Sequence, residues 1–285
     1  MDFSRPSDFT CFLVDNGSLQ PAATRALRRL AGSLATTLAR SVEPVSLLHS
    51  DKIPATELDG IPAEILEPAI RRRFAAGKRQ FLIVPLFFGP SGALTEYIPR
   101  RIAAMGEGLA GLEVAIAAPV AGRDATAPDR RLARILANQV RACVQGQCLS
   151  RPLVVMVDHG SPQRAVGEVR DQVARQLAAE LGDEVRAVFA ASMERRAGPE
   201  YEFTEPLLER ALAAPPCGAG AGDVVVAPMF FSAGRHAGPG GDIENIARKA
   251  ESQHRGLRVH FAPLVGEHPL IVDLLADRYR EAVIP

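Results

Sequence analysis

Short apolar runs alternate along the chain with longer segments whose apolar residues recur at helical spacing. An uninterrupted apolar run bounded by turn residues is typical of a parallel strand buried on both faces. Such runs predict strands at residues 10–14, 42–48, 81–88, 112–120, 153–157, 185–191, 223–231 and 257–265. Helical spacing predicts helices at residues 21–40, 64–76, near 98, 129–144, 163–181, 204–213, 242–253 and 269–283. This alternation of strand and helix predicts an α/β fold.

The order of elements in the second half repeats the order in the first. Landmark residues recur at a nearly constant separation: 143 for Gly17 and Gly160, 143 for Pro85 and Pro228, 144 for Pro119 and Pro263, and 138 for the Glu-Pro pairs that begin at Glu67 and Glu205. We therefore expect two similar flavodoxin-like lobes, residues 1–146 and 147–285, each a mostly parallel four-stranded sheet flanked by helices.

Composition narrows the class of protein. The chain has 33 Lys and Arg against 33 Asp and Glu, a balance that favours neither nucleic acid nor an acidic membrane as partner. No apolar run reaches the roughly 20 residues that span a bilayer. The first six residues lack the features of a signal peptide, which predicts a cytoplasmic protein. The cysteines fit neither a disulfide framework nor a zinc site, so we expect reduced thiols at Cys11, Cys143, Cys148 and Cys217.

Two histidines distinguish the second lobe from the first. His159 follows the strand at 153–157, where the first lobe has Asn16. His236 lies in the loop after the strand at 223–231, where the first lobe has Ala93. In a sheet of order 2-1-3-4 these two strands are neighbours about 4.8 Å apart, and their carboxyl ends flank the crevice where such sheets bind ligands.

Two neutral imidazoles that converge there can hold a borderline divalent cation such as cobalt, nickel, iron(II) or zinc, and can accept protons near neutral pH. A structural alternative is that His159 caps the following helix or hydrogen-bonds within its own turn.

The ordered motifs of the second lobe resemble those of a known family. They are a strand followed by His159-Gly-Ser, then Pro228-x-Phe-Phe with a Gly-x-His236 loop and Asp242-Ile, then Ala262-Pro-Leu-x-Gly-x-His268-Pro. This set resembles the class II tetrapyrrole chelatases, the sirohydrochlorin cobalt-, nickel- and ferrochelatases. The resemblance covers essentially the whole chain as a tandem of two chelatase-like lobes, of which only the second matches well.

The resemblance implies roles for individual residues. His159 and His236 would bind the metal and take part in its insertion, and Glu194 matches a family position that often bears an acidic group near the pocket. The carboxylates of the substrate imply arginines around the crevice, of which Arg164 and Arg235 are the best placed, followed by Arg195 or Arg196. Ser161 is a further candidate for substrate binding.

Alternative roles remain open for several of these residues. Each arginine alone is more often a solvated surface charge. Ser161 has a counterpart, Ser18, in the first lobe, which favours helix capping for both. His236 and Asp242 are six residues apart, where the family has four, so an N-cap is the expected role of Asp242. His268, beside a proline, is expected to mark the start of the last helix.

The expected function is therefore insertion of a divalent metal ion, cobalt first, or nickel or iron, into sirohydrochlorin or a related tetrapyrrole. No nucleotide is expected, because the chain has no phosphate loop of the Gly-x4-Gly-Lys-Ser/Thr type. The alternatives are a non-catalytic carrier of metal or tetrapyrrole and a vestigial site. Single-lobe members of the family pair as dimers, so the fused chain is expected to be a monomer by internal duplication, or a weak dimer.

Overall fold

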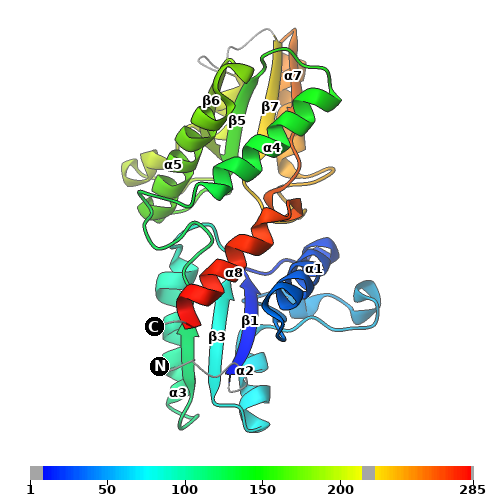
Figure 1. Ribbon diagram of the computed structural model, residues 1–285. Coiled ribbons are helices and arrows are strands. Elements are labelled where there is room, and N and C mark those ends of the chain that lie inside the picture. The colour runs from blue at the N-terminus through cyan, green and yellow to red at the C-terminus, as the bar shows by residue number, and fades with distance from the viewer. Residues whose placement is uncertain (1–8, 214–221, 284–285) are drawn as a thin grey trace. The chain divides into compact units, whose positions relative to one another are not determined.

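The computed structural model of the chain describes residues 9–213 and 222–283 (Figure 1). The first six residues and Cys217 therefore lie outside the described residues. The chain divides into two compact units, Met1–Arg123 with Val272–Pro285, and Asp124–Ile271. We call these unit 1 and unit 2 and describe each by itself.

Unit 1 is built on a parallel sheet of order β2-β1-β3-β4, formed by β1 (Phe9–Asp15), β2 (Glu43–Ser46), β3 (Gln80–Pro85) and β4 (Glu113–Ile116). Phe12, Leu13 and Val14 on the central strand are completely buried, which explains why its sequence is apolar without alternation. The helices of this unit are α1 (Pro21–Leu38), α2 (Leu66–Ala75), α3 (Ile98–Gly106) and most of α8 (Leu270–Val283). Shorter turns are η1 (Ser50–Lys52), η2 (Ala55–Leu58) and the π-helical η3 (Ala93–Tyr97).

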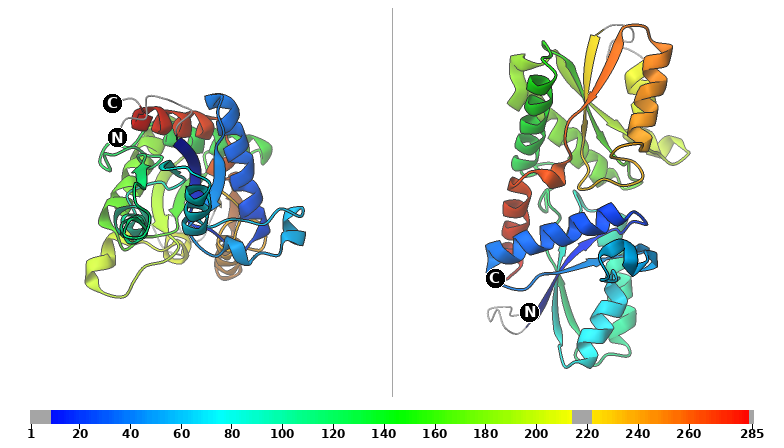
Figure 2. Two further views of the ribbon diagram at one scale, coloured as in Figure 1. Left: turned by 90° about the horizontal axis from the view of Figure 1, so that it is seen from below. Right: turned by 90° about the vertical axis from the view of Figure 1, so that its right-hand side faces the viewer.

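Unit 2 repeats the design with a parallel sheet of order β6-β5-β7-β8, formed by β5 (Leu153–Asp158), β6 (Ala187–Ser192), β7 (Gly222–Pro228) and β8 (Leu257–Phe261). The helices are α4 (Arg131–Gly146), α5 (Arg164–Leu181), α6 (Leu208–Ala213) and α7 (Asp242–Gln253), with 3-10 turns η4 (Gly182–Glu184), η5 (Pro199–Thr204) and η6 (Val265–Glu267). Helices α4 and α5 pack together on one side of the sheet, and α6 and α7 pack together on the other (Figure 2).

The predicted α/β class with two four-stranded parallel sheets is confirmed. The apolar runs overestimate strand length in the third strand of each unit. β3 ends at Pro85 and β7 ends at Pro228, because proline has no N–H to continue the ladder. Among the described residues, no helix is long and apolar enough to cross a membrane.

The two sheets have the same strand order, and the structure corrects one landmark of the sequence comparison. Ser46 at the end of β2 bridges to Ile65, and Ser192 at the end of β6 bridges to Leu207, so Ile65 and Leu207 are equivalent. Glu67 therefore does not correspond to Glu205, and that landmark of the sequence comparison was wrong. The two sequences place a Glu-Pro pair at different points of the same connection.

The compact units differ from the expected lobes 1–146 and 147–285. Helix α4 lies before the expected boundary in sequence but packs against α5 and β7 of unit 2. The residues from Val272 onward belong to unit 1, where Tyr279 stacks on Phe9 of β1 with ring centroids 6.3 Å apart. Unit 2 therefore contains α4, the last helix of the first sequence repeat, and unit 1 contains most of α8, the last helix of the second.

Candidate metal centre

Three functional side chains meet at the carboxyl edge of the sheet in unit 2. His159 directly follows β5, Glu194 follows β6 by two residues, and His236 lies in the loop after β7. Because β5 lies between β6 and β7, the ends of these strands bring the three residues together. One ligand atom from each lies within 4.8 Å of the others. The rule that strand ends share an edge therefore placed the two histidines correctly, and Glu194, which the family resemblance singled out, lies beside them.

The two imidazoles face one another through their inner nitrogens. His159 Nε2 lies 3.2 Å from His236 Nε2, and the ring planes cross at 80° with centroids 4.7 Å apart. Two ligands with metal–nitrogen bonds of about 2.1 Å and this separation would subtend an angle of about 100° at the metal ion. The arrangement therefore fits two adjacent positions of one coordination sphere.

Each outer nitrogen faces an acceptor. His159 Nδ1 is 3.1 Å from the carbonyl oxygen of Gly160, and His236 Nδ1 is 2.9 Å from Asp242 Oδ2. The contact with Asp242 is close but poorly aligned for a hydrogen bond, so it is chiefly electrostatic. Acceptors at both Nδ1 positions favour the tautomers that leave both Nε2 lone pairs free for a metal ion.

The expected N-cap role of Asp242 was wrong. Gly241 is the N-cap of α7 and Asp242 is the first residue of the helix. Its carboxylate instead lies against His236 and, at 3.5 Å, Arg235 Nε. The additional glycines of the loop allow the chain to return far enough for this contact: Asp242 N donates to Arg235 O and Ile243 N to His236 O.

Burial favours the neutral form of His236. Desolvation is the main cause that lowers the pKa of His236, and positive charge on His159 lowers it further. The carboxylates of Glu194 and Asp242 oppose this shift without reversing it. A neutral imidazole offers a lone pair, which is the form that binds a cation.

A glycine allows two backbone turns at the site to come into contact. Gly160 has φ +86°, and a Cβ atom there would lie 2.0 Å from the carbonyl oxygen of Glu194. Glu194 N in turn donates to His159 O at 3.1 Å. The turns that carry His159 and Glu194 are therefore in direct contact, and only glycine fits between them.

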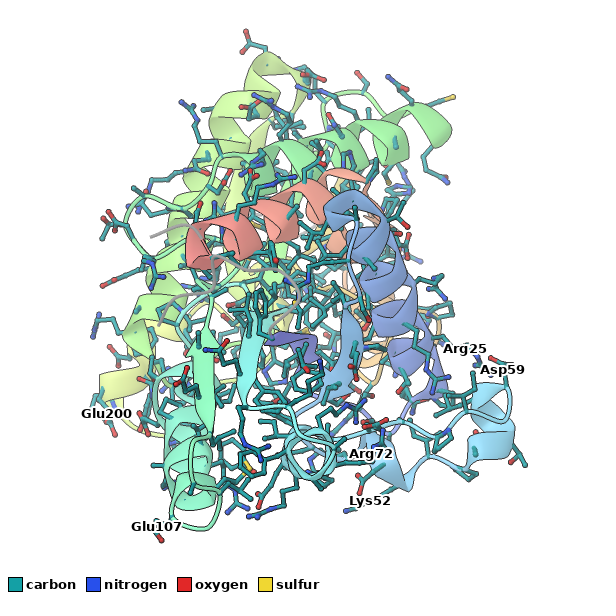
Figure 3. All side chains as sticks on the ribbon, turned by 60° about the horizontal axis from the view of Figure 1, so that its bottom comes forward. Arg25, Lys52, Asp59, Arg72, Glu107 and Glu200 are labelled. Carbon is teal, nitrogen blue, oxygen red and sulfur yellow. The ribbon has the colours of Figure 1, made fainter. Side chains whose placement is uncertain are left out.

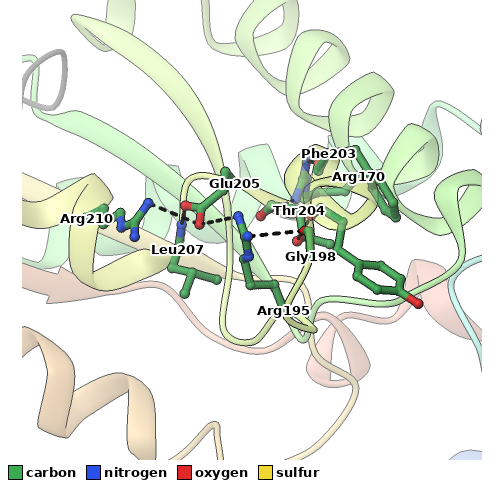
Figure 4. Close-up of polar contacts among 9 residues, drawn as sticks. Arg170, Arg195, Gly198, Phe203, Thr204, Glu205, Leu207 and Arg210 are labelled. Carbon is green, nitrogen blue, oxygen red and sulfur yellow. Dashed lines mark hydrogen bonds and ion pairs between the residues drawn. The ribbon is translucent and has the colours of Figure 1, made fainter.

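A buried polar cluster supports the site from below. Asp158 Oδ1 accepts from Ser192 Oγ at 2.6 Å and from Gly160 N at 3.1 Å. Arg170 Nη1 donates to Ser192 Oγ at 2.6 Å, and its guanidinium also donates to the carbonyls of Phe203 and Thr204 (Figure 4). Burial raises the pKa of Asp158, and the charge of Arg170 opposes the rise.

Sequence reasoning missed Arg170. A charged residue in an amphipathic helix ordinarily faces water, yet Arg170 is only 2% exposed. A usable signal was present in the repeat, because the equivalent position of α1 is the apolar Leu27.

The remaining predicted residues have partners of their own. Ser161 Oγ accepts from Gln163 N at 3.1 Å, as Ser18 Oγ does from Gln20 N, so each serine forms a turn just before its helix. The expected capping role of these serines was wrong, because the N-caps are Gln163 and Gln20 and neither helix has a side-chain cap hydrogen bond. His268 Nδ1 accepts from Leu270 N at 3.2 Å at the start of α8, as expected. The arginines are variously engaged: Arg164 over the Phe203 ring at 4.8 Å, Arg195 with Glu205 at 3.0 Å, Arg196 over Tyr201 at 6.0 Å, and Arg235 with an exposed side chain next to His236.

Comparison with known proteins gives a family match in the second half of the chain. The profile of the CbiX family matches residues 153–282. No curated protein matches the sequence.

Solved structures share the fold across both units. SirB from Bacillus subtilis with Fe3+ has a TM-score of 0.66 at 15% identity and is covered to 96%, with 97% of this chain. SirB from Bacillus subtilis subspecies spizizenii in complex with cobalt has the same TM-score at 14% identity, with 97% of this chain and 95% of the other covered. CbiX, described as the terminal enzyme for biosynthesis of sirohaem in denitrifying bacteria, has a TM-score of 0.57 at 21% identity, with 96% of this chain and 99% of the other covered. Residues 153–282 therefore match the CbiX family, and the chain as a whole shares the fold of the SirB and CbiX structures.

Proposed function

We propose that the protein is a lyase that inserts a divalent metal ion into sirohydrochlorin or a closely related tetrapyrrole without a nucleotide. The observation that carries this proposal is the pair of Nε2 atoms 3.2 Å apart at a strand edge, with Glu194 beside them. The SirB and CbiX structures, solved with cobalt or Fe3+ in two cases, support the reaction class.

The residues support a mechanism in two parts. His159 and His236 present the metal ion through adjacent coordination positions, and Glu194 supplies an oxygen ligand that reduces the positive charge of the complex. As the metal ion enters the macrocycle, two pyrrole N–H protons must leave. The imidazoles released from the metal ion are then free to accept these protons, since their Nε2 lone pairs already point into the site.

Two nitrogen ligands and one carboxylate form a borderline donor set. It suits cobalt, nickel and iron(II), and we place cobalt first among them. Arg235 is the arginine most available to a substrate carboxylate, because its side chain is 77% exposed and its only described partner is Asp242, at 3.5 Å. We propose Arg164 and Ser161 as further contacts at the substrate rim.

The test is an absorbance time course of sirohydrochlorin with Co²⁺, Ni²⁺ or Fe²⁺, with and without the protein. We expect acceleration with at least one metal ion, and its loss in His159→Ala and in His236→Ala. His254→Ala, in the same unit but at the end of α7, is the matched control and should keep full activity.

The carrier alternative makes a different prediction in the same assay. A carrier would shift the absorbance of sirohydrochlorin at one equivalent of protein without turnover. Equal rates with and without protein, for every metal ion tested, would contradict the chelatase proposal.

A further inference from the structure

Unit 1 contains a cavity where unit 2 has a buried arginine. The cavity has a volume of about 190 Å³ and lies between α1, β2 and the segment before α2; Leu27, Ser46 and Pro62 are among its lining residues. Helices α1 and α5 are equivalent, so Leu27 occupies the position of Arg170. Ser46 and Ser192 are likewise equivalent, since both end the second strand of their sheet and pair with the aspartate of the first.

The surroundings of the missing guanidinium are retained in unit 1. In unit 2 Arg170 donates to a serine hydroxyl and to two backbone carbonyls, of Phe203 and Thr204. Counted back from the equivalent residues Ile65 and Leu207, the corresponding carbonyls in unit 1 belong to Ile61 and Pro62. Arg28 donates to both, at 2.7 and 3.3 Å, and to the carbonyl of Leu58 at 3.1 Å. Arg28 therefore replaces the carbonyl contacts of Arg170, and no described hydrogen bond joins it to Ser46.

The loop that borders the cavity is held to α1 by side-chain contacts. Figure 3 shows Arg25 of α1 beside Asp59, with 3.5 Å between Nε and Oδ2, and Arg25 also donates to the carbonyl of Glu57. In unit 2 the ring of Phe203 packs on Gly167, whereas in unit 1 that helix position is Thr24 and Ile61 is 62% exposed. The cavity in unit 1 therefore results from sequence differences between the units on the helix, at Thr24 and Leu27, and on the facing loop, at Ile61.

An unpaired acceptor lies next to Ser46, one of the residues that line the cavity. Asp15, the counterpart of Asp158, accepts a hydrogen bond from the Ser46 side chain, and its Oδ1 is buried without a partner. Burial raises the pKa of Asp15 to about 6, so the carboxyl group is ionised at pH 7.5. The charged lining residues Arg28 and Arg73 are balanced by Glu43 and Glu64, and the ionised Asp15 adds a negative charge next to the lining residue Ser46.

We propose that this cavity in unit 1 binds a small organic cation that carries a guanidinium or amidinium group. The planar donor fork would contact Ser46 Oγ and the inner side of the Ile61 and Pro62 carbonyls, as Arg170 does in unit 2. It would also neutralise Asp15. The site does not depend on the metal centre of unit 2, so failure of one proposal leaves the other intact.

The experiment measures binding of methylguanidinium to the full-length protein by calorimetry at pH 7.5, with methylurea as the neutral probe of the same shape. We expect saturable binding of methylguanidinium in the millimolar range and at least about tenfold weaker binding of methylurea. Leu27→Arg supplies the guanidinium from the chain and should abolish binding. Leu27→Met, which occupies space without charge, controls for the altered wall and should bind more tightly than Leu27→Arg.

Asp15→Asn tests the same site without filling it. We expect binding at least about tenfold weaker than in the unsubstituted protein. Equal affinity for methylurea, affinity unchanged in both Leu27→Arg and Asp15→Asn, or no saturable binding in the millimolar range would overturn the proposal.

Discussion

At the scale of single residues, the contact between Asp242 and His236 is the feature with the clearest consequence for metal binding. A carboxylate against the outer nitrogen fixes the ring orientation and raises the basicity of the ligand nitrogen. We expect Asp242→Ala to weaken Co²⁺ binding about 10–100-fold, measured by the visible absorption of the bound ion. Asp242→Asn, which keeps an oxygen at this position, should lose less.

Glu168, an exposed carboxylate on α5, provides the control for this experiment. Its replacement by alanine should leave Co²⁺ affinity unchanged. If Asp242→Ala also leaves it unchanged, the contact does not orient His236.

Asp15 gives a second prediction at this scale, on stability against pH. Its pKa in the folded protein is about 6, above the ordinary value of 3.8, so the folded state binds its proton more tightly than the unfolded state does. The free energy of unfolding therefore falls as the pH rises from about 4 to about 6, by about 3 kcal/mol for this group. Above pH 7, Asp15→Asn should be more stable than the unsubstituted protein by about 1–3 kcal/mol.

Urea unfolding of both proteins at pH 4 and pH 8 measures this difference, and the other carboxylates cancel in the comparison. Near pH 4 the difference should shrink to about 0.5 kcal/mol, because Asp15 is then protonated in the folded state and nearly half protonated in the unfolded state. A stability difference that does not vary with pH would contradict the assignment of the shift to Asp15.

At the scale of elements, Arg170 attaches η5 to the end of β6. Its guanidinium is buried and all its described partners but Asp171 lie on β6 and η5. We expect Arg170→Leu to destabilise unit 2 by about 3–5 kcal/mol, because Asp158 would lose the nearby positive charge and the carbonyls their donor. Arg195→Ala breaks a half-buried pair with Glu205 in the same region (Figure 4) and should cost about 1 kcal/mol or less.

Thermal unfolding followed by circular dichroism measures both changes. If Arg170→Leu and Arg195→Ala lowered the free energy of unfolding equally, the burial of Arg170 would not determine its contribution to stability.

Elements were predicted well where one local rule decides the outcome, and less well where packing decides it. The apolar runs of β1, β5 and β7 reveal strands, and comparison of the repeats singled out His159 and His236. Asp242 was misread because an acidic residue before a helix ordinarily caps it. In the structure Asp242 contacts His236 instead, because the loop between them brings the two side chains together. The number of residues between them does not predict how this loop folds.

At the scale of the whole molecule, the sequence repeat and the compact units do not coincide. Helices α4 and α8 both lie at the end of a repeat, and each buries an apolar face. Sequence position assigned α4 to the first lobe, whereas the structure places it against α5 and β7. Periodicity predicts that a helix buries one face but not which sheet covers it.

This arrangement predicts how the chain can be divided. A fragment of residues 124–271 keeps α4 and the whole sheet of unit 2, whereas a fragment of 147–285 loses α4 and retains an unpartnered α8. The buried side chains of α4 include Leu132, Ile135, Leu136 and Val140, all 0% exposed, so its loss uncovers the apolar surface of α5 and β7. We expect the first fragment to be monomeric with cooperative unfolding and to bind Co²⁺, and the second to aggregate. Size-exclusion chromatography of the two fragments measures their association, and thermal unfolding measures their cooperativity. A soluble, cooperatively folded fragment 147–285 would show that the sequence repeat, not the compact unit, is the folding domain.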